Sequence, residues 1–314
     1  MTEEMELSVD NLSPDLFERV EQNFDEADAI KRPSLTYWKD VWRRLKENKL
    51  AMVGLGIIGV LIILAIFAPI FSQYSYETQS LKERNLPPSA EHWFGTDGLG
   101  RDLWTRAWYG ARISLTVGFA ATAIQFIVGA IYGGISGCVG GVVDTIMMRI
   151  AEIFYSIPYM LIVILMMVVM SPGLVPIIIA LVVTGWIGMA RLVRGQVLQL
   201  KEQDYVKASE ALGGGLFWKL RKHLIPNTMG PILVDLTLSV PSAIFAEATL
   251  SFLGLGISAP MASWGSMAND GLTGLFTGAA YQLLFPALLI SITMFGFNVF
   301  GDGLRDALDP QLRK

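Results

Sequence analysis

The chain has 314 residues, of which 53% are hydrophobic and 17% charged, and its net charge is −4. Long uncharged apolar runs in such a composition exclude an ordinary soluble domain, so we predict an all-α integral membrane protein. The one cysteine, Cys138, excludes an internal disulfide and lies in an apolar, glycine-rich stretch, where we expect it to pack as a small hydrophobic side chain.

Residues 1–49 are expected to be cytoplasmic. About the first thirty are acidic and poor in aromatic residues, which is typical of disorder. Because this tail precedes the first apolar run, we expect no cleavable signal peptide. Ser34–Asn48 is predicted to be an amphipathic helix that either lies on the inner membrane face or packs on the rest of the protein. Its apolar positions are Tyr37, Trp38, Val41, Trp42 and Leu45.

Six apolar runs are each long enough to cross a membrane as a helix, which takes about 20 residues. Asp235 and Glu247 interrupt the fifth run, which could be a broken or tilted helix. We expect an extracytoplasmic segment at 72–111, a core at 112–303 that includes a cytoplasmic loop at 198–228, and a cytoplasmic tail at 304–314. The six predicted spans are Leu50–Phe71, Ile113–Ile135, Ile146–Met170, Leu174–Ala190, Met229–Leu253 and Leu283–Phe300.

The orientation follows from the distribution of Lys and Arg. These residues concentrate before the first span, between the fourth and fifth spans, and after the sixth, whereas the loop Ser251–Gln282 has none. Because Lys and Arg collect on the cytoplasmic side of membrane proteins, we predict that both termini are cytoplasmic.

The segment Asp204–Asn227, between the fourth and fifth spans, is predicted to be a polar helical hairpin. Asp204 can cap a helix over Tyr205–Leu212, and Gly213 stands where a helix ends in the left-handed conformation. A second helix over Leu216–Leu224 is expected to stop at Pro226. Such a hairpin can dock in a groove of another protein, although an ordinary solvated loop is the alternative. The candidate docking residues are Asp204, Tyr205, Ala208, Ser209, Glu210, Ala211, Gly213, Leu216, Phe217, Leu220 and Pro226.

Other polar and glycine patterns in the spans have two interpretations each. Arg149 and Glu152 are three residues apart and can pair on one helix face. A charge in a span is costly, so Asp235 and Glu247 are expected to face protein or water. Glycines at 129, 133, 137 and 141 allow close helix packing, either within the chain or against another subunit.

The sequence lacks the usual signatures of catalysis. It has no Cys/His cluster and no G-x-x-x-x-G-K-[ST] phosphate loop, and its two histidines, His92 and His223, are predicted on opposite sides of the membrane. We therefore expect no catalytic residue, metal site or cofactor in this chain, and no nucleic-acid partner.

Several motifs resemble those of a known transporter family. Gly213 and Leu224-Ile225-Pro226 resemble parts of the cytoplasmic loop of ABC-importer permeases, although Lys207-Ala208-Ser209 departs from its E-A-A triplet. His92–Gly118, Ser251–Gly271 and Asn298–Arg313 resemble the C-type permease subunit of oligopeptide and dipeptide importers.

The resemblance implies a type I ABC-importer permease in a bacterial cytoplasmic membrane, which would form half of a path for peptides. It implies a B-type permease partner, two ATPase subunits that hold ATP and Mg²⁺, an extracytoplasmic peptide-binding protein and surrounding lipid. Nickel or another small solute is an alternative substrate. A secondary transporter, which would need paired broken helices and an ion site, and a membrane protein without transport are alternative classes.

Within this framework, further residues become candidates. Asp235 and Glu152 are candidates for the solute path, although a structural hydrogen bond for Asp235 and a pair with Arg149 for Glu152 remain open. Glu247 is expected near the outer surface, where it can hold the following loop. The candidates for an extracytoplasmic gate or a binding-protein contact are Glu247, Trp264, Asp97 and Arg101.

Overall fold

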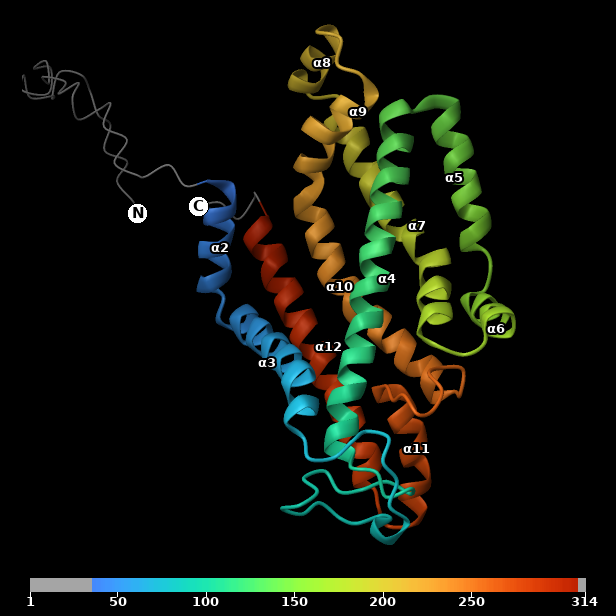
Figure 1. Cartoon of the computed structure of the whole chain (residues 1–314). Helices are drawn as coiled ribbons and strands as arrows, with labels where there is room; N and C mark the ends of the chain where they lie inside the picture. Colours follow the sequence, from blue (N-terminus) through green and yellow to red (C-terminus); the bar gives the residue numbers. More distant parts are fainter. Residues whose placement is uncertain (1–35, 310–314) are drawn as a thin grey trace, which may run out of the picture. The chain divides into compact units, whose positions relative to one another are not determined.

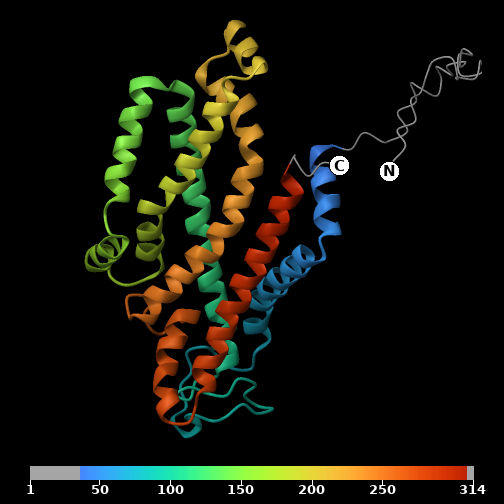
Figure 2. The same cartoon turned by 180° about the vertical axis from the view of Figure 1, so that it is seen from behind.

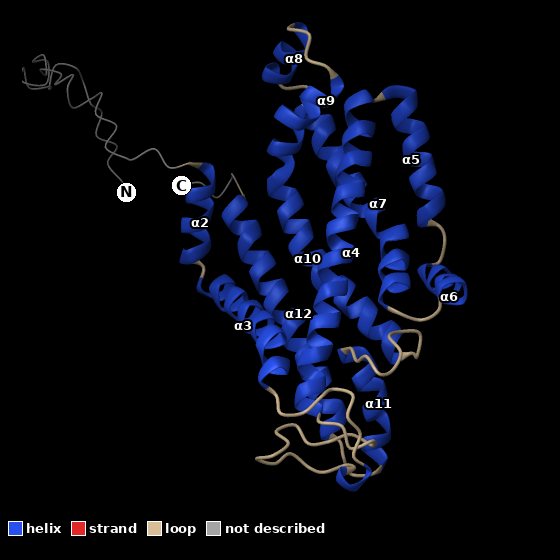
Figure 3. Cartoon of the chain, in the orientation of Figure 1, coloured by secondary structure: helices blue, strands red, loops and turns tan. Residues whose placement is uncertain are grey.

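The computed structural model describes residues 36–309, and the predicted acidic tail lies outside this range. The chain divides into two units, 1–40 and 41–314, and only the beginning of α2 is described in the first. The described part is helical and contains no strand, only an isolated bridge between Thr96 and Asp102 (Figure 3). The all-α prediction is confirmed.

Most of the predicted spans are present as helices. Five stretches are long and apolar enough to cross a membrane, namely α3, α4, α7, α9–α10 and α12. In order, the elements are α2 (Tyr37–Glu47), α3 (Lys49–Phe71), the 3₁₀ turn η3 (Leu81–Glu83), α4 (Leu103–Val139), α5 (Gly141–Tyr155), α6 (Tyr159–Met170), α7 (Leu174–Leu200), α8 (Asp204–Ala211), α9 (Leu216–Lys219), the π turn η4 (Leu220–Leu224), α10 (Ile225–Phe252), α11 (Trp264–Phe276) and α12 (Tyr281–Leu308).

Within the second unit, the connecting segments gather at two ends. The α8–α9 hairpin and the α4–α5 turn lie at one end, whereas the loop between α3 and α4 and helix α11 lie at the other (Figures 1 and 2). We call these the hairpin end and the loop end.

The third predicted span is not one straight helix. In place of a continuous Ile146–Met170, α5 and α6 meet at a bend of 74°. Pro158 stands at the bend as the N-cap of α6. A proline there has no N–H for the carbonyl of Phe154, and its ring would clash with that carbonyl in a continuous helix. The two helices α5 and α6 therefore form a sixth span only if together they cross the membrane as one broken helix.

Other boundaries also differ from the prediction. Helix α4 begins at Leu103, ahead of the predicted Ile113, because the Asp102 carboxylate caps it by accepting a 2.8 Å hydrogen bond from the Thr105 N–H. Part of the predicted extracytoplasmic segment is therefore helical. Helix α11, in the loop 251–282, was not predicted, and a capping box at Ser263 begins it.

Helix α2 confirms the predicted amphipathic pattern. Val41 and Leu45 are buried against Ala307 and Leu308 of α12, whereas Trp42 is 46% exposed. For this part of the helix, the structure supports packing on the rest of the protein.

The glycine strip brings α4 and α7 together. A Cβ atom at Gly133 would lie 2.1 Å from the Ala190 carbonyl oxygen, and Gly129 and Gly137 approach α7 in the same way. Gly141 has nothing within 4 Å and does not belong to the contact. Three of the four glycines therefore pack within the chain.

Candidate functional site

The hairpin turns through a helix-ending motif centred on glycine. The Gly214 N–H donates to the Ser209 carbonyl at 2.8 Å, and the Gly213 N–H donates to the Glu210 carbonyl at 2.9 Å. This pair of bonds is a Schellman motif, and it needs a left-handed residue at the position of Gly213, whose φ is +83°. The prediction for Gly213 is confirmed.

One side of the hairpin packs on the protein. Val206 of α8 and Leu220 and Leu224 of η4 are buried in a cluster with Val193 and Val197 of α7. Lys219 bridges the two arms through an ion pair of 3.1 Å with Glu210. The hairpin is therefore held on the ends of α7 and α10.

The other side of the hairpin is exposed and carries large apolar side chains beside charged ones. Leu212 is 89% exposed and Phe217 79% exposed, and Trp218, Tyr205 and Ala208 are exposed as well. Large apolar groups gathered on a protruding segment indicate a contact with another protein. Of the predicted docking residues, Ala211 and Pro226 are also exposed, whereas Ser209 and Leu216 are half-buried.

Two details of the hairpin were predicted wrongly. Gln203, not Asp204, is the N-cap of α8, and it makes no side-chain capping bond, so Asp204 occupies the first helical turn. Pro226 does not stop the second helix, because a proline in the first turn of α10 needs no hydrogen-bond donor there. The π turn η4 precedes Pro226 and carries the chain into α10 without a break.

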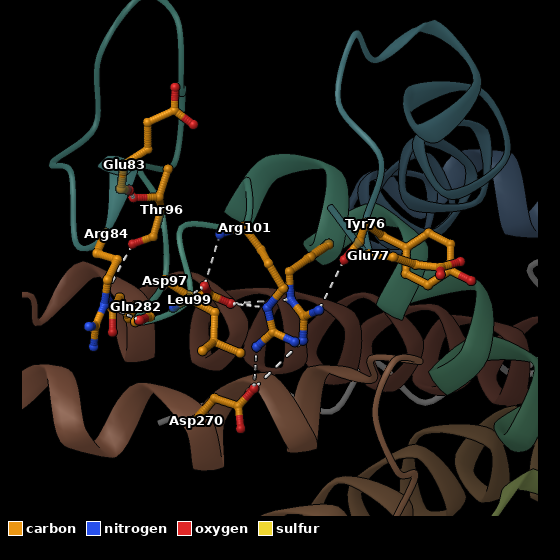
Figure 4. Close-up of polar contacts among 12 residues, drawn as sticks. Tyr76, Glu77, Glu83, Arg84, Thr96, Asp97, Leu99, Arg101, Asp270 and Gln282 are labelled. Atoms are coloured by element: carbon orange, nitrogen blue, oxygen red, sulfur yellow. Dashed lines mark hydrogen bonds and ion pairs between the residues drawn. The ribbon is translucent and has the colours of Figure 1, made fainter. Parts of the chain in front are cut away.

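At the loop end, the candidate residues Asp97 and Arg101 belong to one ionic cluster (Figure 4). Arg101 Nε donates to Asp97 at 2.6 Å, and Arg101 Nη2 donates to Asp270 of α11 at 3.2 Å. Arg106 of α4 lies 3.7 Å from Asp97 and 3.6 Å from Asp270. The two arginines and Asp97 are buried, and the two carboxylates compensate the two cations, which would be costly to bury without an anion.

The cluster and its neighbours tie the loop to α11 and α12. Gln282 Nε2 donates to the Thr96 carbonyl at 3.0 Å and to Asn85 Oδ1 at 2.8 Å. Arg106 also donates to the Tyr76 carbonyl at 3.1 Å. The loop is thus fixed at several points from separate helices.

Sequence reasoning missed Arg106 and Asp270. A signal for Asp270 was available, because it lies in the loop 251–282, which has no Lys or Arg. Asp270 is 50% exposed, and any cation that pairs with it must come from another segment.

Glu247 and Trp264 lie in the core beside this end. Glu247 is fully buried and accepts hydrogen bonds from Ser114 of α4 at 2.8 Å and from Ser251 at 2.7 Å. Ser251 lies in the last turn of α10, so this bond is within the helix, and the expected tie to the following loop stays a prediction. Trp264 is also fully buried, and its Nε1 donates to the Ala107 carbonyl at 2.9 Å. In this conformation Trp264 packs in the core and offers no surface to a binding protein, and its role in a gate stays a prediction.

The two candidates for the solute path are not brought together. Asp235 is half-buried on α10, with the Ser239 hydroxyl 3.5 Å away. Glu152 is on the exposed side of α5 and pairs with Arg149 at 2.7 Å, as predicted for residues three apart. Within residues 36–309, no hydrogen bond or ion pair links Asp235 to Glu152.

A second ion pair was also missed. Arg194 of α7 binds the Asp144 carboxylate of α5 through two hydrogen bonds of 2.5 and 2.6 Å. The Ser136 hydroxyl of α4 donates to the same carboxylate. This pair joins α4, α5 and α7 at the hairpin end. Among the described residues, no group of three or more His, Cys, Asp or Glu could hold a metal ion.

Comparisons with known proteins agree with this architecture. Residues 127–314 match the family described as binding-protein-dependent transport system inner membrane component. Residues 36–88 match the N-terminal TM domain of oligopeptide transport permease C. A structure titled as an inward-facing MetNI methionine ABC transporter is similar at a TM-score of 0.51 and 21% identity, over 64% of this chain and 94% of that one, and supports the fold.

Two curated relatives are similar over nearly the whole chain. The dipeptide transport system permease protein DppC of Bacillus subtilis is 59% identical over 289 residues, which cover 92% of this chain and 90% of the relative. The oligopeptide transport system permease protein OppC of the same organism is 57% identical over 304 residues, which cover 97% of this chain and 99% of the relative. The resemblance to C-type permeases is thus confirmed. The chain is a multi-pass membrane protein and belongs to the family of binding-protein-dependent transport system inner membrane components.

Proposed function

We propose that the chain is a permease subunit of an ATP-driven bacterial importer and forms half of a transmembrane path for oligopeptides or dipeptides. The high identity to two relatives named as dipeptide and oligopeptide transport permeases supports this proposal. A B-type permease subunit would supply the other half of the path. Nickel or another small solute of the same subfamily is the alternative substrate.

In this proposal the hairpin end is cytoplasmic, together with both termini. Lys and Arg support the orientation, since Arg191, Arg194 and Lys201 precede the hairpin and Lys219 and Arg221 lie in it. Helix α12 also runs from the loop end toward the hairpin end (Figure 1).

The observation that carries the proposal is the exposed side of the hairpin, with the large apolar side chains of Leu212, Phe217 and Trp218. An ATPase subunit would cover this side. Two such subunits would bind ATP and Mg²⁺ and hydrolyse the nucleotide, while this chain catalyses nothing itself. Movement of the hairpin would then reorient the spans in alternating access.

At the loop end, an extracytoplasmic peptide-binding protein would deliver the solute. The segments 72–111 and 251–282 would receive it, and the ionic cluster of Asp97, Arg101, Arg106 and Asp270 supports a firm surface there. Asp235 would line the solute path. Glu152 is a weaker candidate, because it is exposed and paired with Arg149.

Copurification tests the coupling role. The tagged full chain would be coexpressed with the other subunits, as wild type, as Phe217→Glu and as Phe276→Glu. Phe276 is 91% exposed at the end of α11, so the control carries the same change at the loop end. We expect wild type and Phe276→Glu to recover an ATPase pair and Phe217→Glu to lose most of it.

Failure has a defined meaning. If the intact wild-type complex contains no ATPase, and uptake in vesicles follows an ion gradient without ATP, a secondary transporter replaces this proposal. The broken pair α5–α6 is one element such a transporter would use, but a second broken pair is absent from residues 36–309.

A further inference from the structure

A cavity of about 510 Å³ lies at the loop end of α3. It is separate from the ionic cluster, with which it shares no lining residue. One wall is an apolar side of α3 that includes Phe67 and Phe71. The other walls come from the residues after α3, from residues 90–93 and from the start of α4. The cavity therefore connects the side of a span that faces lipid with a polar loop.

The polar walls of the cavity are negative. Asp102 is buried, and its carboxylate accepts hydrogen bonds from Thr105 and contacts His92 Nδ1 at 2.9 Å. Glu91 lies exposed at the cavity, and no Lys or Arg is among the lining residues. Burial raises the pKa of Tyr74, and the carboxylates of Glu91 and Asp102 raise it further. The site therefore favours a cation.

Aromatic rings line the cavity beside these carboxylates. The Trp93 and Trp104 ring centroids are 4.7 Å apart at an angle of 64°, and Tyr74 packs on His92 at 4.6 Å. Ring faces attract organic cations, and this attraction adds to that of a carboxylate. A carboxylate beside exposed ring faces is a combination that suits an alkylammonium group.

We propose that this cavity binds the primary ammonium head group of an aminophospholipid in the leaflet at the loop end. The ammonium lies between Glu91 and the rings of Trp93 and Trp104, and the acyl chains lie along Phe67 and Phe71. Because no basic residue lines the cavity, the lipid phosphate stays at its mouth in water.

The position of the cavity favours a lipid over a soluble amine. Phe71 is 79% exposed and Phe67 48% exposed, and both lie on a helix long and apolar enough to span the membrane. Acyl chains therefore reach this wall without entering the protein, and tryptophan is enriched at this depth in membrane proteins. The proposal needs only that α3 spans the membrane and is independent of the transported solute.

Native mass spectrometry of the full-length protein in its complex tests the proposal. The sample would come from nanodiscs that contain equal amounts of phosphatidylethanolamine and phosphatidylglycerol. The variants are Glu91→Gln, which removes the charge and keeps the shape, and Glu77→Gln, the same change in the same loop outside the cavity. We expect wild type and Glu77→Gln to retain phosphatidylethanolamine preferentially, and Glu91→Gln to lose roughly tenfold in this preference, the loss of one charge-assisted contact.

The outcomes are separable. Equal retention of the two lipids by wild type would overturn the proposal, as would an unchanged preference in Glu91→Gln. A second arm adds soluble ethanolamine. If it displaces phosphatidylethanolamine at concentrations similar to those of the lipid, the acyl chains contribute nothing and the lipid assignment is wrong. Retention against a large excess of ethanolamine supports the lipid.

Discussion

The close contact between α4 and α7 should make Gly133 intolerant of even one methyl group. In Gly133→Ala, the new Cβ would lie 2.1 Å from the carbonyl oxygen of Ala190, 2.9 Å from its carbonyl carbon and 3.0 Å from its Cα. All three neighbours are backbone atoms, so no flexible side chain can move away. The two helices must therefore separate locally.

The expected cost follows from two opposing effects. Overpacking of this kind costs about 1–3 kcal/mol. Alanine in place of glycine stabilises a helix by about 1 kcal/mol through its higher helix propensity. Gly188→Ala, in α7, is the matched control, because it makes the same exchange in a helix with nothing within 4 Å of the new Cβ. The difference between the two variants isolates the packing cost.

Thermal unfolding of the purified proteins in one detergent measures this difference. We expect Gly188→Ala to unfold at or above the wild-type temperature and Gly133→Ala below it. If the two variants have the same unfolding temperature, the helices adjust without cost and the inferred close contact does not stabilise the fold.

Four further changes follow from the structure. Gly213→Val should strain the hairpin turn by about 1–2 kcal/mol and reduce solute transported per ATP hydrolysed in proteoliposomes, and normal coupling would contradict the role of the turn. Asp235→Asn should alter peptide uptake by cells, whereas unchanged kinetics would return Asp235 to a structural role. Asp144→Asn should lower the unfolding temperature by leaving Arg194 without its anion; the cost should be less than the roughly 3–5 kcal/mol of a wholly buried pair, and Arg194→Met in addition should restore part of it. Glu247→Leu should be more destabilising than Glu247→Gln, because leucine has no acceptor for the hydroxyls of Ser114 and Ser251, and each lost hydrogen bond costs about 1–3 kcal/mol. Equal unfolding temperatures of the two variants would show that these bonds are not needed.

Much of the fold could be predicted because hydropathy and helix length are local properties of the chain. The run that became α3 has no charge, and its predicted bounds differ from the structure by one residue at the start. The hairpin turn was predictable for a similar reason, since a Schellman motif depends on one glycine, Gly213, and its neighbours. Helix α11 was not predicted because its 13 residues do not form a long apolar run.

Prolines show why the broken third span was not predicted. Pro158 stands at the bend between α5 and α6, but Pro69, Pro241 and Pro286 lie inside continuous helices. The residue type alone therefore does not decide between a break and a continuous helix. The surroundings of the prolines differ. Pro241 is buried between packed helices, and Arg112 bonds the carbonyl that Pro69 leaves free, whereas the residues around Pro158 are largely exposed. Such packing is not visible in one sequence.

The candidate sites were predicted to the extent that their contacts are close in sequence. Arg149 and Glu152 are three residues apart, and their pair was predicted from that spacing. Asp97 and Arg101 are four residues apart and were predicted as candidates at this end, but not as a pair. The bond from Arg101 to Asp270 joins residues 169 positions apart. Nothing in the spacing of single residues shows that such a pair will meet.

Arg112 and Pro69 show how two costly residues in spans can compensate each other. Pro69 has no N–H, so the Ala65 carbonyl of α3 loses its helical donor. Arg112 of α4 supplies donors in its place, with Nε 2.6 Å from the Ala65 oxygen and Nη2 2.5 Å from the Ile66 oxygen. Near lipid an unpaired carbonyl and an unpaired cation are both expensive, because no water is present to solvate them. The two residues therefore cost less free energy together than each would alone, and their contact fixes the register of α3 on α4.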